Sequence, residues 1–107
     1  MKIGIIITQT KPETVWNTFR LANFALAQGD EVKIFLVGEG VEYESGSSKK
    51  FNIQEQATEF LKSDKAEIMA CGTCLKLRKQ EETNTCPIST MKDLYALVNE
   101  CDKILTF

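Results

Sequence analysis

The sequence contains no histidine. Histidine is the usual partner of a catalytic Cys or Ser, a common zinc ligand and the usual general acid or base near neutral pH. Its absence excludes Cys-His and Ser-His nucleophiles, histidine-based zinc sites and acid–base catalysis by histidine. An activated nucleophile in this chain must instead rely on backbone dipoles, burial or neighbouring Lys and Arg side chains.

Long apolar runs and a marked charge imbalance are also missing. No apolar segment approaches the roughly 20 residues that span a bilayer. The apolar start, 1–8, is too short for a secretory signal and is followed by no small-residue cleavage site. A net charge of −2 gives no reason to expect nucleic acid or a membrane as a partner. We therefore expect a cytoplasmic protein, in which cysteine pairs are more often catalytic or metal-binding than disulfide-bonded.

The chain of 107 residues has the size of one domain and can bury an ordinary core. Strand and helix patterns alternate along it. The predicted strands are 2–8, 32–37, 65–70 and 103–107. The predicted helices are 12–28, 53–61, 74–82 and 91–101. This alternation predicts an α/β fold with βαβ units and a parallel sheet covered on both faces.

Local signals refine this outline. Asn52-x-x-Glu55 and Thr90-x-x-Asp93 predict the caps of two helices. Segment 38–50 is rich in Gly, Ser, Glu and Lys, which predicts a solvated, mobile loop with room for one short helical turn. Segment 83–88 is a connection that can hold a short strand. The residues of the last helix expected to face inward are Met91, Leu94, Leu97, Val98 and Cys101.

The segment Cys71-Gly72-Thr73-Cys74 places two thiols one helical turn apart, directly after a predicted buried strand. Free backbone N–H groups at a strand-to-helix junction favour negative charge, so Cys71 is expected to tend towards the reactive thiolate. Gly72 lets the backbone bend closely around an anion. Ligands of parallel sheets sit beyond the carboxyl ends of the strands, where Cys71 lies. The alternative is a half-buried core cysteine, a common fate of free Cys.

The other three cysteines are open to two interpretations each. Cys74 either resolves an oxidised or persulfidated Cys71 or packs in the core. Cys86 either approaches Cys71 as part of the binding site or is structural, and Cys101 is better explained as core. Because only one close Cys pair exists, a zinc site is the weaker alternative, and we expect no metal and no cofactor.

Two further groups of residues are candidates for substrate binding. Lys76 and Arg78 follow the cysteine pair, and either could lower the pKa of Cys71 or dock an acidic partner, whereas Lys79 is better explained as a solvated charge. Thr8 and Gln9 follow the first predicted strand and reach the same expected ligand edge.

Three segments together resemble the short members of the DsrE/DsrF-like sulfur-relay family. They are Ala70–Arg78 (ACGTCLKLR), Cys86–Leu94 (CPISTMKDL) and the closing Asp102–Phe107 (DKILTF). The resemblance implies a three-layer α/β/α sandwich with a mainly parallel sheet of four to five strands. It also implies a homo-oligomer, commonly a trimer or hexamer.

The same resemblance suggests roles for individual residues. Members of the family carry sulfur as a persulfide on a cysteine that follows the third strand and precedes an arginine by seven residues. Cys71 and Arg78 match this spacing. The family often has Gly after the arginine, where this chain has Lys79. The substrate-binding candidates are Thr8, Gln9, Gly72, Thr73, Arg78 and Cys86.

These observations lead to one hypothesis with two alternatives. In the hypothesis, Cys71 takes sulfane sulfur from a donor persulfide, shelters it under the helix start and segment 38–50, and passes it to an acceptor thiol, with partner proteins as donor and acceptor. The first alternative is dithiol redox chemistry of Cys71 and Cys74. The second is a non-catalytic oligomeric binding module.

Overall fold

The computed structural model describes all residues, 1–107, and is built on a five-stranded sheet in the order β4-β3-β2-β1-β5. All four strand pairs are parallel. The strands are β1 (Lys2–Ile7), β2 (Glu31–Leu36), β3 (Ala66–Cys71), β4 (Ile88–Ser89) and β5 (Lys103–Thr106). The predicted α/β class and parallel sheet are confirmed, and the short β4 supplies the fifth strand.

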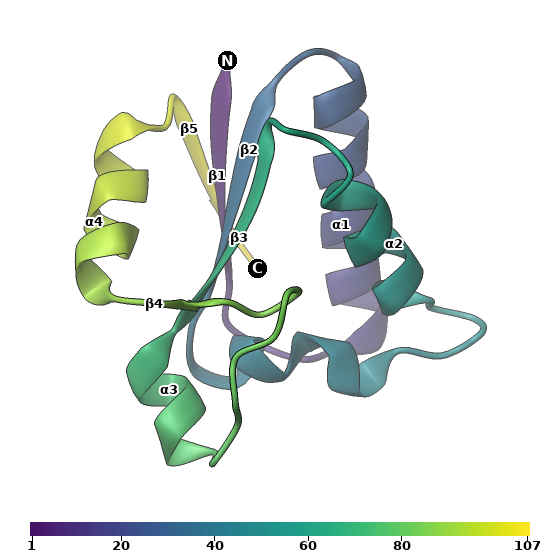
Figure 1. Ribbon diagram of the computed structural model, residues 1–107. Coiled ribbons are helices and arrows are strands. Elements are labelled where there is room, and N and C mark those ends of the chain that lie inside the picture. Colours follow the sequence, from purple (N-terminus) through teal and green to yellow (C-terminus); the bar gives the residue numbers. More distant parts are fainter.

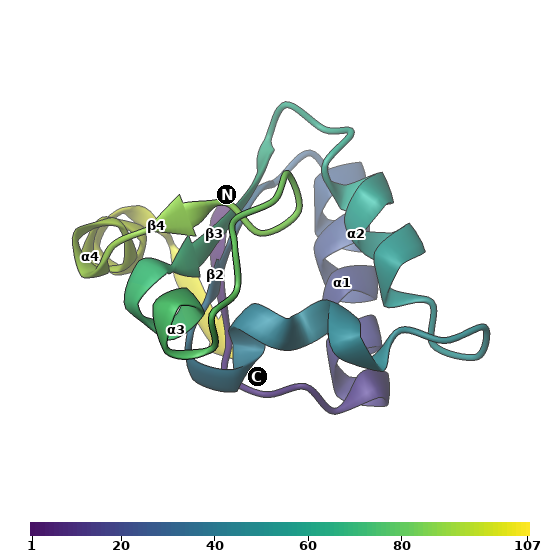
Figure 2. The same cartoon turned by 60° about the horizontal axis from the view of Figure 1, so that its bottom comes forward.

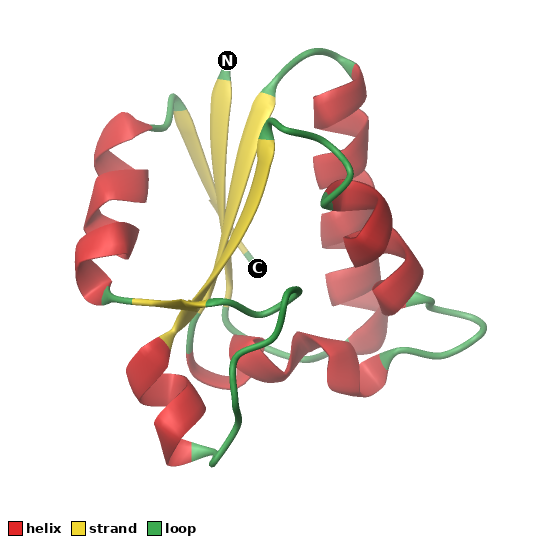
Figure 3. Ribbon diagram, viewed as in Figure 1, coloured by secondary structure: helices red, strands yellow, loops and turns green.

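Helices cover both faces of this sheet, which gives three layers (Figure 1). The α-helices are α1 (Pro12–Ala27), α2 (Ile53–Phe60), α3 (Gly72–Leu77) and α4 (Met91–Glu100), and η1 (Gly38–Gly46) is a 3-10 helix. Figure 3 shows α1 and α2 on one side of the yellow sheet and α4 on the other. None of these helices has the length and apolar character needed to cross a membrane.

The core is divided between the two faces because side chains alternate along each strand. On β3, Ile68 and Ala70 belong to the larger core under α1 and α2. Met69 and Cys71 belong to a smaller cluster with Phe35 of β2 and Leu97 of α4. Cys71 is therefore on the α4 face of the sheet.

Segment 38–50 differs from the predicted mobile loop. It holds η1, in which Val41 and Tyr43 are buried, and the Tyr43 ring stacks on Phe19 of α1 with centroids 5.3 Å apart. A Cβ built on Gly40 would lie 1.9 Å from the backbone oxygen of Ile7, so only glycine allows η1 to pack this closely on the end of β1. The segment is polar overall, but its two buried side chains, Val41 and Tyr43, fix it against the rest of the protein.

Helix α3 begins two residues earlier than predicted and is only six residues long. It ends because Lys79 has a φ of 52°, the left-handed conformation that terminates helices and favours glycine. This is the position at which the resembling family often has Gly. Segment 74–82 also contains few apolar residues, so a longer helix would have little surface to bury.

Both predicted caps start their helices. The Asn52 side chain accepts a hydrogen bond of 3.0 Å from the Glu55 N–H, and the Asp93 carboxylate accepts one of 2.9 Å from the Thr90 N–H. The inward face predicted for α4 is partly wrong. Leu97 is buried, but Met91 and Val98 are 54% and 50% exposed, because a helix on a sheet buries a narrower stripe than the one the apolar residues occupy.

Candidate functional site

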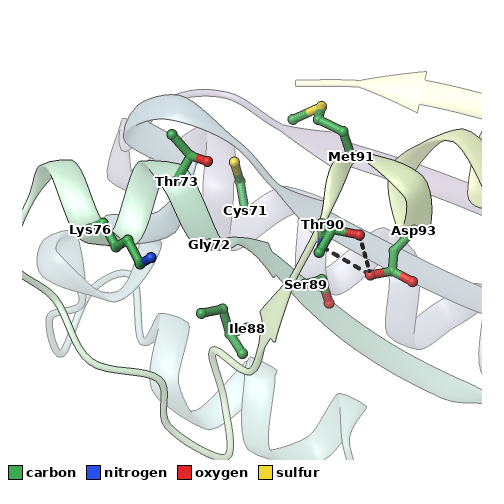
Figure 4. Close-up of a pocket in the computed structure, with 9 residues that line it drawn as sticks. All are labelled: Cys71, Gly72, Thr73, Lys76, Ile88, Ser89, Thr90, Met91 and Asp93. Carbon is green, nitrogen blue, oxygen red and sulfur yellow. Dashed lines mark hydrogen bonds between the residues drawn. The ribbon is translucent and has the colours of Figure 1, made fainter.

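Cys71 lines a cavity of about 560 Å³ at the carboxyl end of β3 (Figure 4). Its side chain is only 4% exposed. One wall comes from α3, through Gly72, Thr73 and Lys76. The opposite wall comes from residues 88–91 and Asp93, at the junction of β4 and α4. The cavity thus lies at the strand edge where parallel sheets bind ligands.

The pairing of β4 with β3 creates this cavity. Cys71 lies opposite Ser89 in the register, and the Ala70 N–H donates a 2.8 Å hydrogen bond to the Pro87 carbonyl. A Cβ on Gly72 would lie 3.0 Å from Cγ1 of Ile88. Glycine therefore allows α3 to start tight against β4, so that the first turns of α3 and α4 flank one thiol.

The pKa of the Cys71 thiol is raised above its ordinary value, mainly by burial. The backbone N–H groups of Cys74 and Thr73 act in the opposite direction, whereas the Cys74 side chain raises the pKa further. The expectation of a resting thiolate is wrong, because loss of hydration outweighs the backbone dipoles. The raised pKa therefore favours the protonated thiol of Cys71 at neutral pH.

Cys74 lies close to Cys71 but does not line the cavity. Its half-buried side chain packs against both core clusters, and its sulfur accepts a 3.2 Å hydrogen bond from the Gly38 N–H. Figure 2 brings the carboxyl ends of the strands forward and shows α3 beside η1, the two elements that this contact joins. The thiol pair is thus asymmetric, with Cys71 at the cavity and Cys74 behind it.

Cys86 and Cys101 are separated from the cavity. Cys86 is buried in the larger core, on the other face of the sheet, where its sulfur contacts the Val41 carbonyl at 3.5 Å. Burial raises its pKa to about 11. Cys101 follows the end of α4 and packs beneath it. The Cys, Asp and Glu side chains form no group of three or more that could hold a metal ion.

The remaining candidates lie away from the Cys71 cavity. Thr8 donates a 3.0 Å hydrogen bond to the Phe107 carbonyl, and Gln9 accepts one of 2.7 Å from the Lys11 N–H. Both follow β1, which is two strands from β3 in the sheet order. Arg78 turns to Glu42 of η1, at 3.4 Å, and to the Cys74 carbonyl, at 3.2 Å. The role of these three residues in substrate binding stays a prediction.

The sequence pattern does not place residues 88–93 at the site. It predicts a helix cap at Thr90 and Asp93 and a core position for Met91, because the parallel pairing of a two-residue strand leaves almost no local signal. We also expected segment 38–50 to shelter the sulfur. No residue of that segment lines the cavity, since η1 packs across the ends of β1 and β2 instead. The useful signal was the family resemblance, whose second segment contains the opposite wall.

Comparisons with known proteins agree with this description. The uncharacterized protein MJ0989 of Methanocaldococcus jannaschii is 34% identical, with both chains fully covered. The uncharacterized protein MK0008 of Methanopyrus kandleri is 33% identical over 98% of this chain and 93% of its own length. The crystal structure of the ychN protein from E. coli shares the fold, with a TM-score of 0.79, 23% identity and full coverage of both chains.

The family assignment rests on the whole chain rather than on the cysteine motif alone. The sequence profile of the DsrE/DsrF-like family, which is associated with sulfur relay, matches residues 1–107. With two relatives above 30% identity over nearly their full lengths, the chain belongs to the DsrE/DsrF-like family.

Proposed function

We propose that this protein is a small cytoplasmic sulfur carrier that holds sulfane sulfur as a persulfide on Cys71 and passes it to an acceptor thiol. The observation that carries the proposal is that Cys71 is the one cysteine of four that lines a cavity. The family's association with sulfur relay supports it at a coarser level. The partners are proteins that bear the donor persulfide and the acceptor thiol.

The transfer consists of two thiol exchanges. Cys71 attacks the outer sulfur of a donor R–S–SH, a new S–S bond forms, and the electron pair of the broken bond leaves with the donor thiolate. The net reaction converts Cys71–SH and R–S–SH into Cys71–S–SH and R–SH. An acceptor thiol repeats the exchange and restores Cys71–SH. Because the resting thiol is protonated, the approaching donor must take up its proton.

Dithiol chemistry is a second candidate because the Cys74 side chain is close enough to raise the pKa of Cys71. In this scheme the Cys74 thiolate attacks the inner sulfur of the Cys71 persulfide. A disulfide between the two cysteines forms and hydrosulfide leaves.

The proposed assembly is a homo-oligomer, a trimer or hexamer as the family resemblance implies. Helix α4 offers an apolar stripe for contact with a second copy. Met91, Tyr95 and Val98 follow one another at helical spacing on its outer face, and Tyr95 is 72% exposed. Because Met91 also lines the cavity, contact along this stripe would bring a second copy close to Cys71.

Intact-mass analysis after incubation with a persulfide donor tests the proposal. The wild type and the Cys74→Ser variant are expected to gain the mass of one sulfur atom, and the Cys71→Ser variant is expected to gain none. Loss of two hydrogens from the wild type, without added sulfur, would support the dithiol scheme. An unchanged wild-type mass would support the third possibility, a binding module with passive cysteines.

A further inference from the structure

The Cys71 cavity contains one cationic side chain, that of Lys76. It extends from α3 with its Nζ turned toward the space between Cys71 and Ile88 (Figure 4). Lys76 makes no ion pair within the protein, whereas Arg78, two residues later, is paired with Glu42. The charge of Lys76 is therefore available to a molecule in the cavity.

The other polar groups of the cavity do not neutralise this charge. Asp93 is the one carboxylate that lines it, and its Oδ2 accepts hydrogen bonds of 2.9 and 3.1 Å from the N–H and hydroxyl of Thr90. This carboxylate is held at the first turn of α4, and no ion pair joins it to Lys76. Thr73 and Ser89 supply hydroxyl groups that can donate to an anion.

Lys76 is not among the main influences on the resting Cys71 thiol. Those influences are burial and the groups of Cys74 and Thr73. A lysine that lines the cavity but is not among these main influences is suited to a charge that arrives with the donor. The same position suits the outer sulfur of a Cys71 persulfide, which extends one bond further from Cys71 into the cavity.

We propose that Lys76 binds the negative charge of a small anionic sulfur compound, of which inorganic polysulfide is the simplest, so that such a compound can load Cys71 in addition to a donor protein. The inference rests on the proposed function of Cys71. The net reaction converts Cys71–SH and a polysulfide dianion of n sulfur atoms into the persulfide anion Cys71–S–S⁻ and a hydropolysulfide anion of n−1 atoms. One S–S bond forms, one breaks, and the thiol proton leaves with the departing polysulfide. Lys76 then pairs with the persulfide anion.

The test compares charge selectivity at Cys71 in the full-length protein. Site-resolved alkylation rates are measured with anionic iodoacetate and neutral iodoacetamide, which are similar in size. The variants are Lys76→Gln, Lys76→Arg and the matched control Lys79→Gln. The control removes the same charge from Lys79, which lies three residues after Lys76 and does not line the cavity. Two opposite unit charges about 4 Å apart in water attract each other by about 1 kcal/mol, which corresponds to about fivefold in a rate. Lys76→Gln should therefore lower the ratio of the iodoacetate rate to the iodoacetamide rate by about fivefold.

Lys76→Arg and Lys79→Gln should keep the ratio within about twofold of the wild type, and salt should reduce the wild-type ratio. Sulfur uptake from inorganic tetrasulfide should slow by about fivefold in Lys76→Gln alone. Equal ratios in Lys76→Gln and Lys79→Gln would overturn the inference. The two failures can be distinguished. The alkylation ratio tests the role of Lys76 without any sulfur donor, whereas the proposed function fails if Cys71 gains no sulfur from a donor.

Discussion

Cys71 is subject to two opposing influences on its ionisation. Burial favours the neutral thiol, and the N–H groups of Thr73 and Cys74 favour the thiolate. Burial prevails at rest. A persulfide is a stronger acid than a thiol, so the same N–H groups can hold the anion once the second sulfur is in place. This balance fits the proposed function, in which Cys71 holds a buried persulfide rather than acting as an exposed nucleophile.

The raised pKa of Cys71 predicts a specific pH dependence. Only the thiolate reacts with iodoacetamide, and its fraction rises about tenfold per pH unit below the pKa. The alkylation rate of Cys71 should therefore keep rising beyond the ordinary thiol pKa of about 8.5. Peptide-resolved rates between pH 6 and 10, with the unfolded protein as control, measure this. A plateau below pH 8 would show that the backbone groups prevail over burial.

At this scale the sequence pointed to the cysteine that lines the cavity, but not to the residues that surround it. Cys71 could be recognised because a buried strand ends directly at it. The sequence shows Lys76 only as one of several neighbouring charged residues. Its position in the cavity could not be predicted, because the cavity exists only once β4 pairs with β3. The burial of Cys71 raises its pKa, whereas the sequence predicted a lowered one. This burial depends on Leu97 and Phe35, which come from elements distant in the sequence.

Among the elements, η1 shows how a polar segment becomes fixed. Tyr43 donates a 2.7 Å hydrogen bond to the Thr85 carbonyl, and Gln80 donates one of 2.9 Å to the Val41 carbonyl. These bonds hold the connection between α3 and β4 against η1. Because that connection leads directly into β4, η1 supports one wall of the Cys71 cavity from a distance.

Gly40→Ala should destabilise the protein by about 3 kcal/mol, because the new methyl group would collide with the backbone of Ile7, which cannot move aside as a flexible side chain can. Urea unfolding measures the loss. Gly38→Ala is the control: Gly38 has a φ of 59° and open space around it, so this change should cost only about 1 kcal/mol of backbone strain. Equal losses of stability in both variants would mean that the contact of Gly40 with Ile7 costs no more than the backbone strain at Gly38.

The order and type of the main elements could be predicted because their signals are local. The apolar residues of β1 and β2, the proline that starts α1 and the two side-chain caps each act within a few residues. The lengths of α3 and β4 could not be predicted in the same way. The end of α3 depends on a left-handed lysine, and β4 exists because its two residues find a parallel partner in β3.

For the molecule as a whole, the exposed stripe of α4 predicts self-association. Light scattering should give a mass three or six times that of one chain. Val98→Glu should shift the protein towards smaller species, because it places a charge in the proposed contact. Phe24→Glu, on the exposed side of α1, removes an apolar side chain from the opposite layer and should leave the mass unchanged. A monomeric wild type at micromolar concentration would contradict the proposed assembly.

The most direct measurement of the central claim locates the added sulfur. The wild-type protein is loaded with a persulfide donor, its sulfane sulfur is trapped by alkylation, and fragment ions of the peptide that contains both Cys71 and Cys74 are read. One extra sulfur on Cys71, lost when an acceptor thiol is added before trapping, is the predicted result. An extra sulfur on Cys74, Cys86 or Cys101, with none on Cys71, would contradict the account.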